Sequence, residues 1–281
     1  MATGPHEPST SHERVLLTFF ALTFAITWGC WVPLAVGVAL HSIPGRALGY
    51  AGTFAPALVA LALAFKRARA AGVRELLARL QPRAVAARWV AFALGFTIAV
   101  KLAAALLHRA ITGAWPAFGS EPFWLMALGT LVSTPVQAGE ELGWRGVALP
   151  HLATRLGLAR ASLLLGVVWA LWHLPLFFVR GADSYGQSFP LYAIGVVAIS
   201  AAIAMLYART SGGLLLPTLF HAAVNNTTGI VPTASPGAHA VFSLRAPLIA
   251  WLTAAVLWAC TAPILMWMVR TEPQRTGTYE P

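Results

Sequence analysis

Long apolar segments alternate with short polar ones along most of the chain. A helix needs about 20 apolar residues to cross the hydrocarbon core of a bilayer. Apolar segments of spanning length can be drawn eight times, at 15–40, 47–65, 89–107, 122–141, 160–179, 189–208, 213–230 and 246–269. The pattern therefore predicts an all-α, polytopic membrane protein with about eight transmembrane helices and both termini on one side.

Two amphipathic stretches lie between these segments. Residues 70–89 place four aliphatic side chains at helical spacing with arginines between them, which predicts an amphipathic helix on the cytoplasmic surface. A second short amphipathic piece is expected at 150–160, opened by Pro150. No interior stretch has the composition of a linker, so we expect one domain, 15–270, between a polar N-terminal tail, 1–14, and a C-terminal tail, 271–281.

Composition agrees with a membrane location and charge adds an orientation. The chain is 58% hydrophobic and 10% charged, and its net charge of +10 forms no nucleic-acid-reading motif. With the N-terminus inside, 14 Lys and Arg residues fall in inside segments and 4 in outside loops, with Lys101 left within a span. The expected location is the plasma (inner) membrane, with both termini cytoplasmic. Cys30 and Cys260 lie in apolar runs without metal-site or disulfide spacing and are expected to be packing residues.

Acidic residues are rare inside the spans, where only Glu140 and Glu141 occur. Glu141 and Arg145 stand four residues apart and can pair on one helix face, while Glu140 points about 100° away. A buried carboxyl group without its own counter-ion can exchange protons near neutral pH, as a general base must. The alternative is that all three side chains form one ion-pair cluster at the membrane surface.

Two histidines, His173 and His221, are embedded in later spans. Asn225 follows His221 by one helical turn, and Trp169 precedes His173 by one turn as an apolar wall. One reading is metal-dependent: Glu140, His173 and His221 could hold zinc, although the helical HExxH pattern is absent. The other is metal-free, with Glu140 and His173 activating water and His221 with Asn225 donating to an oxyanion. Both readings lead to attack of water on an amide.

Three motifs resemble those of one known family. "EELGWR" is similar to its EExxxR motif, "WALWH" to [FW]xxxH and "HAAVN" to HxxxN, in the family's order. The family is the CAAX protease and bacteriocin-processing family (CPBP or Abi) of intramembrane endopeptidases. The resemblance implies a membrane-embedded protease core. It assigns water activation to Glu140 and His173, oxyanion stabilisation to His221 and Asn225, and shaping of the site to Glu141 and Arg145, and it leaves the need for a metal open.

The expected function is hydrolysis of peptide bonds in membrane-associated peptides or proteins, with the lipid bilayer as surroundings and no nucleic-acid partner. The alternative is a non-proteolytic immunity or adaptor protein, or a small transporter that uses Glu140 and His173 as a proton relay. We also expect the fourth span to remain helical as far as Pro150, so that the glutamates are submerged in a cavity reached from the cytoplasm.

Overall fold

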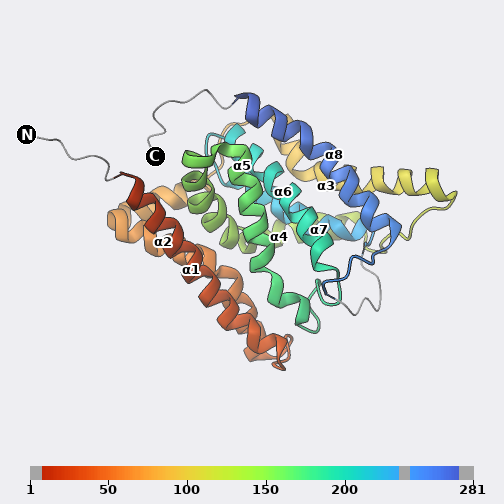
Figure 1. Ribbon diagram of the computed structural model, residues 1–281, viewed down its shortest axis with the longest axis horizontal. Helices are drawn as coiled ribbons and strands as arrows, with labels where there is room; N and C mark the ends of the chain where they lie inside the picture. The colour runs from red at the N-terminus through yellow and green to blue at the C-terminus, as the bar shows by residue number, and fades with distance from the viewer. Residues whose placement is uncertain (1–7, 234–240, 272–281) are drawn as a thin grey trace, which may run out of the picture.

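The computed structural model describes residues 8–233 and 241–271, and among these it contains helices and no β-strand. Within these two ranges, eight α-helices are joined by short loops and by three short helices of other types (Figure 1). The α-helices are α1 (Pro8–Ala35), α2 (Ile43–Ala78), α3 (Ala87–Thr112), α4 (Phe123–Gly143), α5 (Leu149–Trp172), α6 (Phe189–Arg209), α7 (Leu215–Thr227) and α8 (Leu248–Thr271). The short helices are the π-helix η1 (Trp144–Ala148) and the 3₁₀ helices η2 (Leu174–Phe178) and η3 (Thr228–Ile230).

The all-α, polytopic membrane fold is confirmed, but eight crossings are not. Six segments of the described chain are long and apolar enough to span a bilayer, and one of them is the continuous helical run Phe123–Phe178. Helix α7 has 13 residues, or about 20 Å of rise, whereas the hydrocarbon core is about 30 Å thick. Each predicted span contains an α-helix, yet α7 is too short to cross alone.

The helices define two ends of the molecule. At one end, the ion pair between Arg155 and Glu13 joins the starts of α5 and α1, and the Leu214 amide donates to the Arg79 carbonyl. We call this the basic end, because most arginines lie here. At the opposite end, Gly119 donates its amide to Ile230 and Phe189 donates to Val241. We call this the loop end.

Several boundaries differ from the sequence prediction. Helix α1 begins at Pro8, inside the expected N-terminal tail, whose residues 1–7 lie outside the described part. The predicted amphipathic helix at 70–89 is shorter than expected: residues 70–78 form the end of α2 beyond a kink at Arg69, which has a φ of 53°. Pro150 does not end the helix, because it lies in the first turn of α5, where the missing N–H is tolerated. The chain turns instead at Gly157, whose φ of 74° suits glycine.

Glycines let the central helices approach closely. A Cβ atom at Gly139 would lie 2.5 Å from the Phe54 ring, and one at Gly143 would lie 2.5 Å from Pro56, so α4 packs on α2 through a GxxxG pair. Gly166 plays the same role between α5 and α6. These contacts hold the end of α4 in the centre of the bundle.

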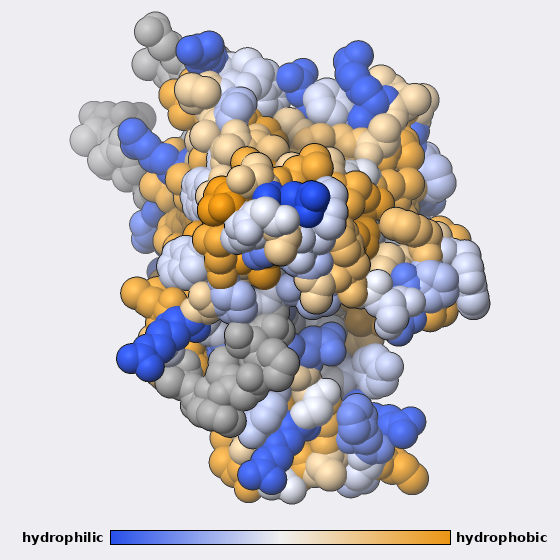
Figure 2. Space-filling view, turned by 90° about the vertical axis from the view of Figure 1, so that its right-hand side faces the viewer, coloured by the Kyte–Doolittle hydropathy of each residue, from blue (hydrophilic) through white to orange (hydrophobic). Residues whose placement is uncertain are grey.

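Outside this centre the surface is apolar. Leu17, Leu58, Leu106, Leu131 and Val269 are among the exposed aliphatic side chains. Figure 2 shows one side of the molecule, where broad hydrophobic areas separate scattered hydrophilic side chains. An apolar perimeter of this kind is what lipid contact requires.

Candidate active site

The predicted acidic pair lies where α4 passes into the π-helix η1. Glu140 and Glu141 are on the last turn of α4, and Arg145 is the second residue of η1. Because Pro150 has no N–H, the carbonyl of Gly146 lacks its α-helical donor. Arg79 supplies a donor, since its Nη1 lies 3.0 Å from the Gly146 oxygen. The π-helix and the hydrogen bond from Arg79 therefore allow the chain to continue from the acidic pair into α5 without a break in helical structure.

Glu141 is the centre of a buried charged cluster. Its Oε1 accepts a hydrogen bond from Arg145 Nη1 at 2.9 Å and lies 2.9 Å from His221 Nδ1. Both Glu141 and Arg145 are fully buried. The predicted i, i+4 pair is thus present, whereas the contact with His221, which reaches across from α7, was not foreseen. Glu140 makes no ion pair among the described residues, so a single cluster of all three predicted side chains does not form.

Arg145 is held on three sides. Its Nη2 donates to Ser200 Oγ on α6 at 3.3 Å, and Ser200 Oγ donates to the carbonyl of Ser162 on α5 at 2.8 Å. Its guanidinium carbon lies 4.7 Å from the centre of the Trp169 ring, a cation–π contact. The arginine thereby links four helical elements and fixes the carboxylate that holds His221.

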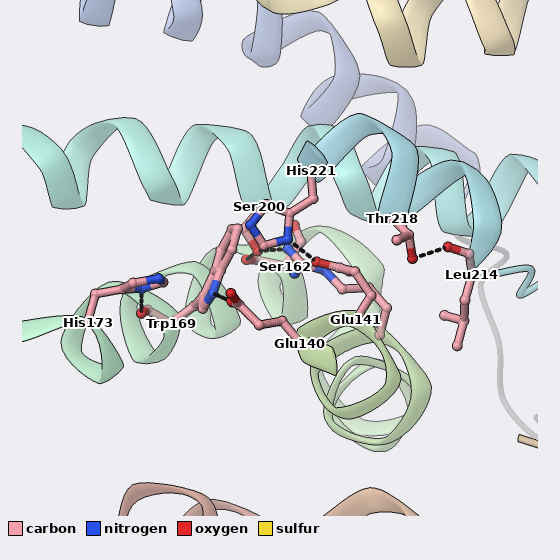
Figure 3. A network of polar contacts seen from close by, with 10 residues as sticks. Glu140, Glu141, Ser162, Trp169, His173, Ser200, Leu214, Thr218 and His221 are labelled. Atoms are coloured by element: carbon pink, nitrogen blue, oxygen red, sulfur yellow. Dashed lines mark hydrogen bonds and ion pairs between the residues drawn. The ribbon is translucent and has the colours of Figure 1, made fainter. Parts of the chain in front are cut away.

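Glu140 points away from this cluster and toward Trp169 (Figure 3). Trp169 Nε1 donates to Glu140 Oε2 at 2.8 Å. Glu140 Oε1 makes no hydrogen bond with any described residue. Trp169 was expected as an apolar wall beside His173, and its ring centre does lie 5.8 Å from that of His173. Its second role was not foreseen: the indole N–H orients the Glu140 carboxylate, and in Figure 3 the ring lies between Glu140 and His173.

The hydrogen bonds of the two histidines identify the nitrogen that each leaves free. His173 Nδ1 lies 2.9 Å from the Trp169 carbonyl oxygen. Because a carbonyl oxygen only accepts, Nδ1 carries the proton and a neutral His173 leaves Nε2 as an acceptor. His221 Nδ1 is bound in the same way by the Glu141 carboxylate. In both imidazoles the hydrogen bond at Nδ1 therefore fixes the orientation of the ring, and Nε2 remains available to contact water or a substrate.

These side chains border a cavity of about 1000 Å³. His173, His221, Asn225 and Trp169 all line it, which brings together four of the predicted site residues. Glu140 is not part of the wall, although Trp169, which holds it, is. The wall also contains two residues that we did not single out as site residues, Tyr192, whose ring centre lies 5.7 Å from that of His173, and Lys101 on α3.

The cavity opens at the loop end. Its rim contains His41 between α1 and α2, Arg46 in the first turn of α2, residues 181–184 and 187–188 after η2, and residues 245–247 before α8. Access was expected from the end that carries most arginines, and this is wrong, because the rim residues lie at the opposite end. The glutamates were expected to be submerged in this cavity, but both are buried in the protein and neither forms part of the cavity wall.

The predicted metal set does not assemble. In the described residues no three His, Cys, Asp or Glu side chains converge as metal ligands. The hydrogen bonds explain this arrangement, because Glu141 and His221 bind each other and Trp169 separates Glu140 from His173. The set Glu140, His173 and His221 therefore does not fit zinc in this conformation.

The polar supports were hidden in the sequence for a physical reason. Ser162 and Ser200 are small residues in apolar helices, where serine commonly bonds its own backbone. Only the tertiary packing of α5 on α6 turns them toward Arg145. Tyr192, at the start of α6, gave no signal, because an aromatic residue near a span end is also typical of the membrane interface.

Two comparisons with known proteins bear on this site. Residues 120–227 match the sequence model of the Rce1-like family, described as type II CAAX prenyl endopeptidase Rce1-like. The chain is also 34% identical over 92 residues to CAAX prenyl protease 2 of Methanococcus maripaludis, an alignment covering 31% of this chain and 34% of that protein. The chain thus matches about a third of the length of this curated relative. The family match contains α4, η1, α5 and α7 and the residue His173 that directly follows α5, and together these include every residue of the predicted site. Through residues 120–227 the chain is thus similar to the Rce1-like CAAX prenyl endopeptidases, in agreement with the resemblance of its three motifs to the CPBP family.

Proposed function

We propose that this protein is an intramembrane endopeptidase that hydrolyses peptide bonds of membrane-associated peptides or proteins. The observation that carries the proposal is the pair of imidazoles, His173 and His221, each fixed through Nδ1 and each lining one cavity. The matches to CAAX prenyl endopeptidases support the same reaction.

In the proposed mechanism a water molecule is activated beside Trp169. Glu140 Oε1 and His173 Nε2 are the two acceptor atoms left free next to this ring. One of them removes a proton from the water, and the hydroxide attacks the carbonyl carbon of the scissile peptide bond. The C–N bond then breaks and the proton passes to the leaving amine nitrogen, which yields a carboxylate and an amine.

The developing oxyanion would be stabilised from α7. Asn225 lines the cavity one turn after His221, and its side-chain amide supplies N–H donors. His221 in its protonated form supplies Nε2–H, while Glu141 and Arg145 hold the ring in place. Donors that are fixed before the reaction are the most effective, because they need no reorganisation in the transition state.

The test is cleavage of a peptide library by the purified full-length protein. Glu140→Gln and His173→Ala are expected to abolish cleavage, and Asn225→Ala to slow it by about 10²–10³, the usual cost of one oxyanion donor. Asn226→Ala is the matched control, because Asn226 binds Ser133 and a backbone carbonyl rather than lining the cavity. Wild-type turnover retained in folded Glu140→Gln and His173→Ala would contradict the mechanism.

We also propose that both termini face the cytoplasm of a cell whose inner membrane holds the protein. The excess of Lys and Arg at the basic end supports this orientation. Since the cavity opens at the loop end, substrates would then reach it from the side away from the cytoplasm.

Cysteine labelling tests the orientation independently of activity. In a variant with Cys30 and Cys260 replaced by serine, Ser184→Cys lies on the cavity rim and Arg83→Cys at the basic end. A membrane-impermeant maleimide added to intact cells is expected to label the first and not the second. The reverse pattern would place the cavity on the cytoplasmic side.

A further inference from the structure

Lys101 is a buried cation in the wall of the cavity. It lies on the fourth turn of α3, its side chain is 4% exposed, and it lines the same cavity as His173 and His221. Its Nζ donates to the carbonyl of Val231, just after η3, at 2.9 Å. No carboxylate among the described residues pairs with it.

A lone ammonium group in this place is costly to the protein. Taking a charge out of water without a counter-ion opposes folding, so charged residues within spans are rare and serve a purpose. An ammonium group has three donors, of which Val231 uses one. The remaining two can bind a carboxylate, and the bond to Val231 already fixes the position of the nitrogen.

The rest of the wall favours an anion too. Arg46 and Arg245 lie on the rim of the same cavity, and Asp183 is the acidic residue among the described wall residues. Three cationic side chains thus face one carboxylate. A cavity lined mainly by one sign of charge concentrates ligands of the other sign.

The spacing between Lys101 and the reaction centre suits a short peptide. From His221 the chain continues through the end of α7 and through η3 to Val231, where Lys101 binds. At the usual rise of these helices this path is roughly 15 Å long. An extended peptide covers that distance in roughly four or five residues.

We propose that Lys101 determines specificity by binding a carboxylate of the peptide held in the cavity, a few residues from the scissile bond. This inference rests on the proposed function for the identity of the ligand as a peptide. The carboxylate can be the C-terminus of the peptide or the side chain of an Asp or Glu residue, and the two have the same chemistry at the lysine.

The experiment measures binding, so that its outcome does not depend on cleavage. Three fluorescein-labelled apolar octapeptides are compared on the purified full-length Glu140→Gln protein: one with a free C-terminal carboxylate, one with a C-terminal amide, and one with the amide and an Asp five residues from the C-terminus. The protein is expected to bind at least one carboxylate peptide about tenfold more tightly than the amide, as a charge-assisted hydrogen bond predicts. The peptide that gains identifies the source of the carboxylate.

Lys101→Met, in the same background, is expected to remove the preference while binding of the amide peptide stays unchanged, which shows that the cavity is intact. Lys101→Arg should keep part of the preference, which also covers the case in which Lys101→Met does not fold. Lys66→Met is the matched control, because Lys66, the other lysine of the chain, is exposed on α2 just before its kink and does not line the cavity. Equal affinity for all three peptides, or a preference that survives in Lys101→Met, would overturn the proposal. Failure of every peptide to be cleaved by the wild type would instead count against the proposed function alone.

Discussion

Removing either partner of the buried ion pair between Glu141 and Arg145 should strongly destabilise the protein. Both side chains are fully buried, so the remaining charge has no access to water. Glu141→Gln and Arg145→Met keep the side-chain volumes similar, which isolates the electrostatic part. A buried pair that loses one partner costs about 3 to 5 kcal/mol.

The structure predicts an asymmetry between the two substitutions. Glu141 Oε1 serves both Arg145 and His221, so Glu141→Gln leaves two groups without their carboxylate. Arg145→Met leaves Glu141 still bound to His221. We therefore expect Glu141→Gln at the upper end of the range and Arg145→Met at the lower end.

The double variant should recover part of this loss, because no charge is then left unpaired within the pair. Coupling energies of contacting residues reach about 0.5 to 3 kcal/mol, and a fully buried pair belongs in the upper half of that range. The free energy of unfolding can be followed by tryptophan fluorescence as the purified protein is titrated with SDS in mixed micelles. The exposed pair of Arg67 and Glu75 is the control, with an expected coupling below about 1 kcal/mol. Single effects that add to the double effect within about 0.5 kcal/mol would refute the reasoning.

Three further predictions concern packing and support. Gly52→Ala should destabilise the protein by about 1 to 3 kcal/mol, since the new Cβ would lie 2.2 Å from the indole nitrogen of Trp31 on α1. Gly95→Ala should be tolerated, because no atom lies within 4 Å of its Cβ position, and the melting temperatures of the two variants test this. Arg79→Ala removes three hydrogen bonds, to the Gly146 and Gly212 carbonyls and to the Tyr207 hydroxyl, and should cost about 3 kcal/mol by the same micelle titration. The more exposed Arg83→Ala should cost less than about 1 kcal/mol, and similar values for both would contradict the role of Arg79. Trp169→Phe removes the hydrogen bond to the Glu140 carboxylate and should lower kcat about tenfold to a hundredfold with little change in KM. Steady-state cleavage kinetics test this, and an unchanged kcat would show that this bond does not contribute to catalysis.

The sequence was most informative where a feature is local. The apolar pattern located the eight α-helices, and the i, i+4 spacing predicted the pair of Glu141 and Arg145, because both depend only on neighbours in the chain. The sequence could not show that His221 would share that carboxylate, since the two residues are 80 positions apart. The distance between them is set by the packing of α7 against α4.

Helix ends were less predictable for a related reason. Pro150 reads as a helix start, yet the π-helix and the Arg79 side chain satisfy the backbone before it, and the chain turns only at Gly157. The location of the cavity rim was also missed. Hydropathy and charge predict which side of the membrane each end of a span faces. A cavity, in contrast, arises from gaps between packed helices, which no single segment of the sequence specifies.

The π-helix at Trp144–Ala148 constrains how this segment can change in length. A π-turn closes with one residue more than an α-turn, so it behaves as a single-residue insertion absorbed within a helix. Deleting one residue there would restore α-helical bonding and narrow the turn from which Arg145 reaches Glu141. The geometry of this ion pair would then change, although neither glutamate had been substituted. Insertions and deletions in these five residues should therefore be as damaging as substitutions of the glutamates themselves, which makes the length of this turn as much a part of the site as its side chains.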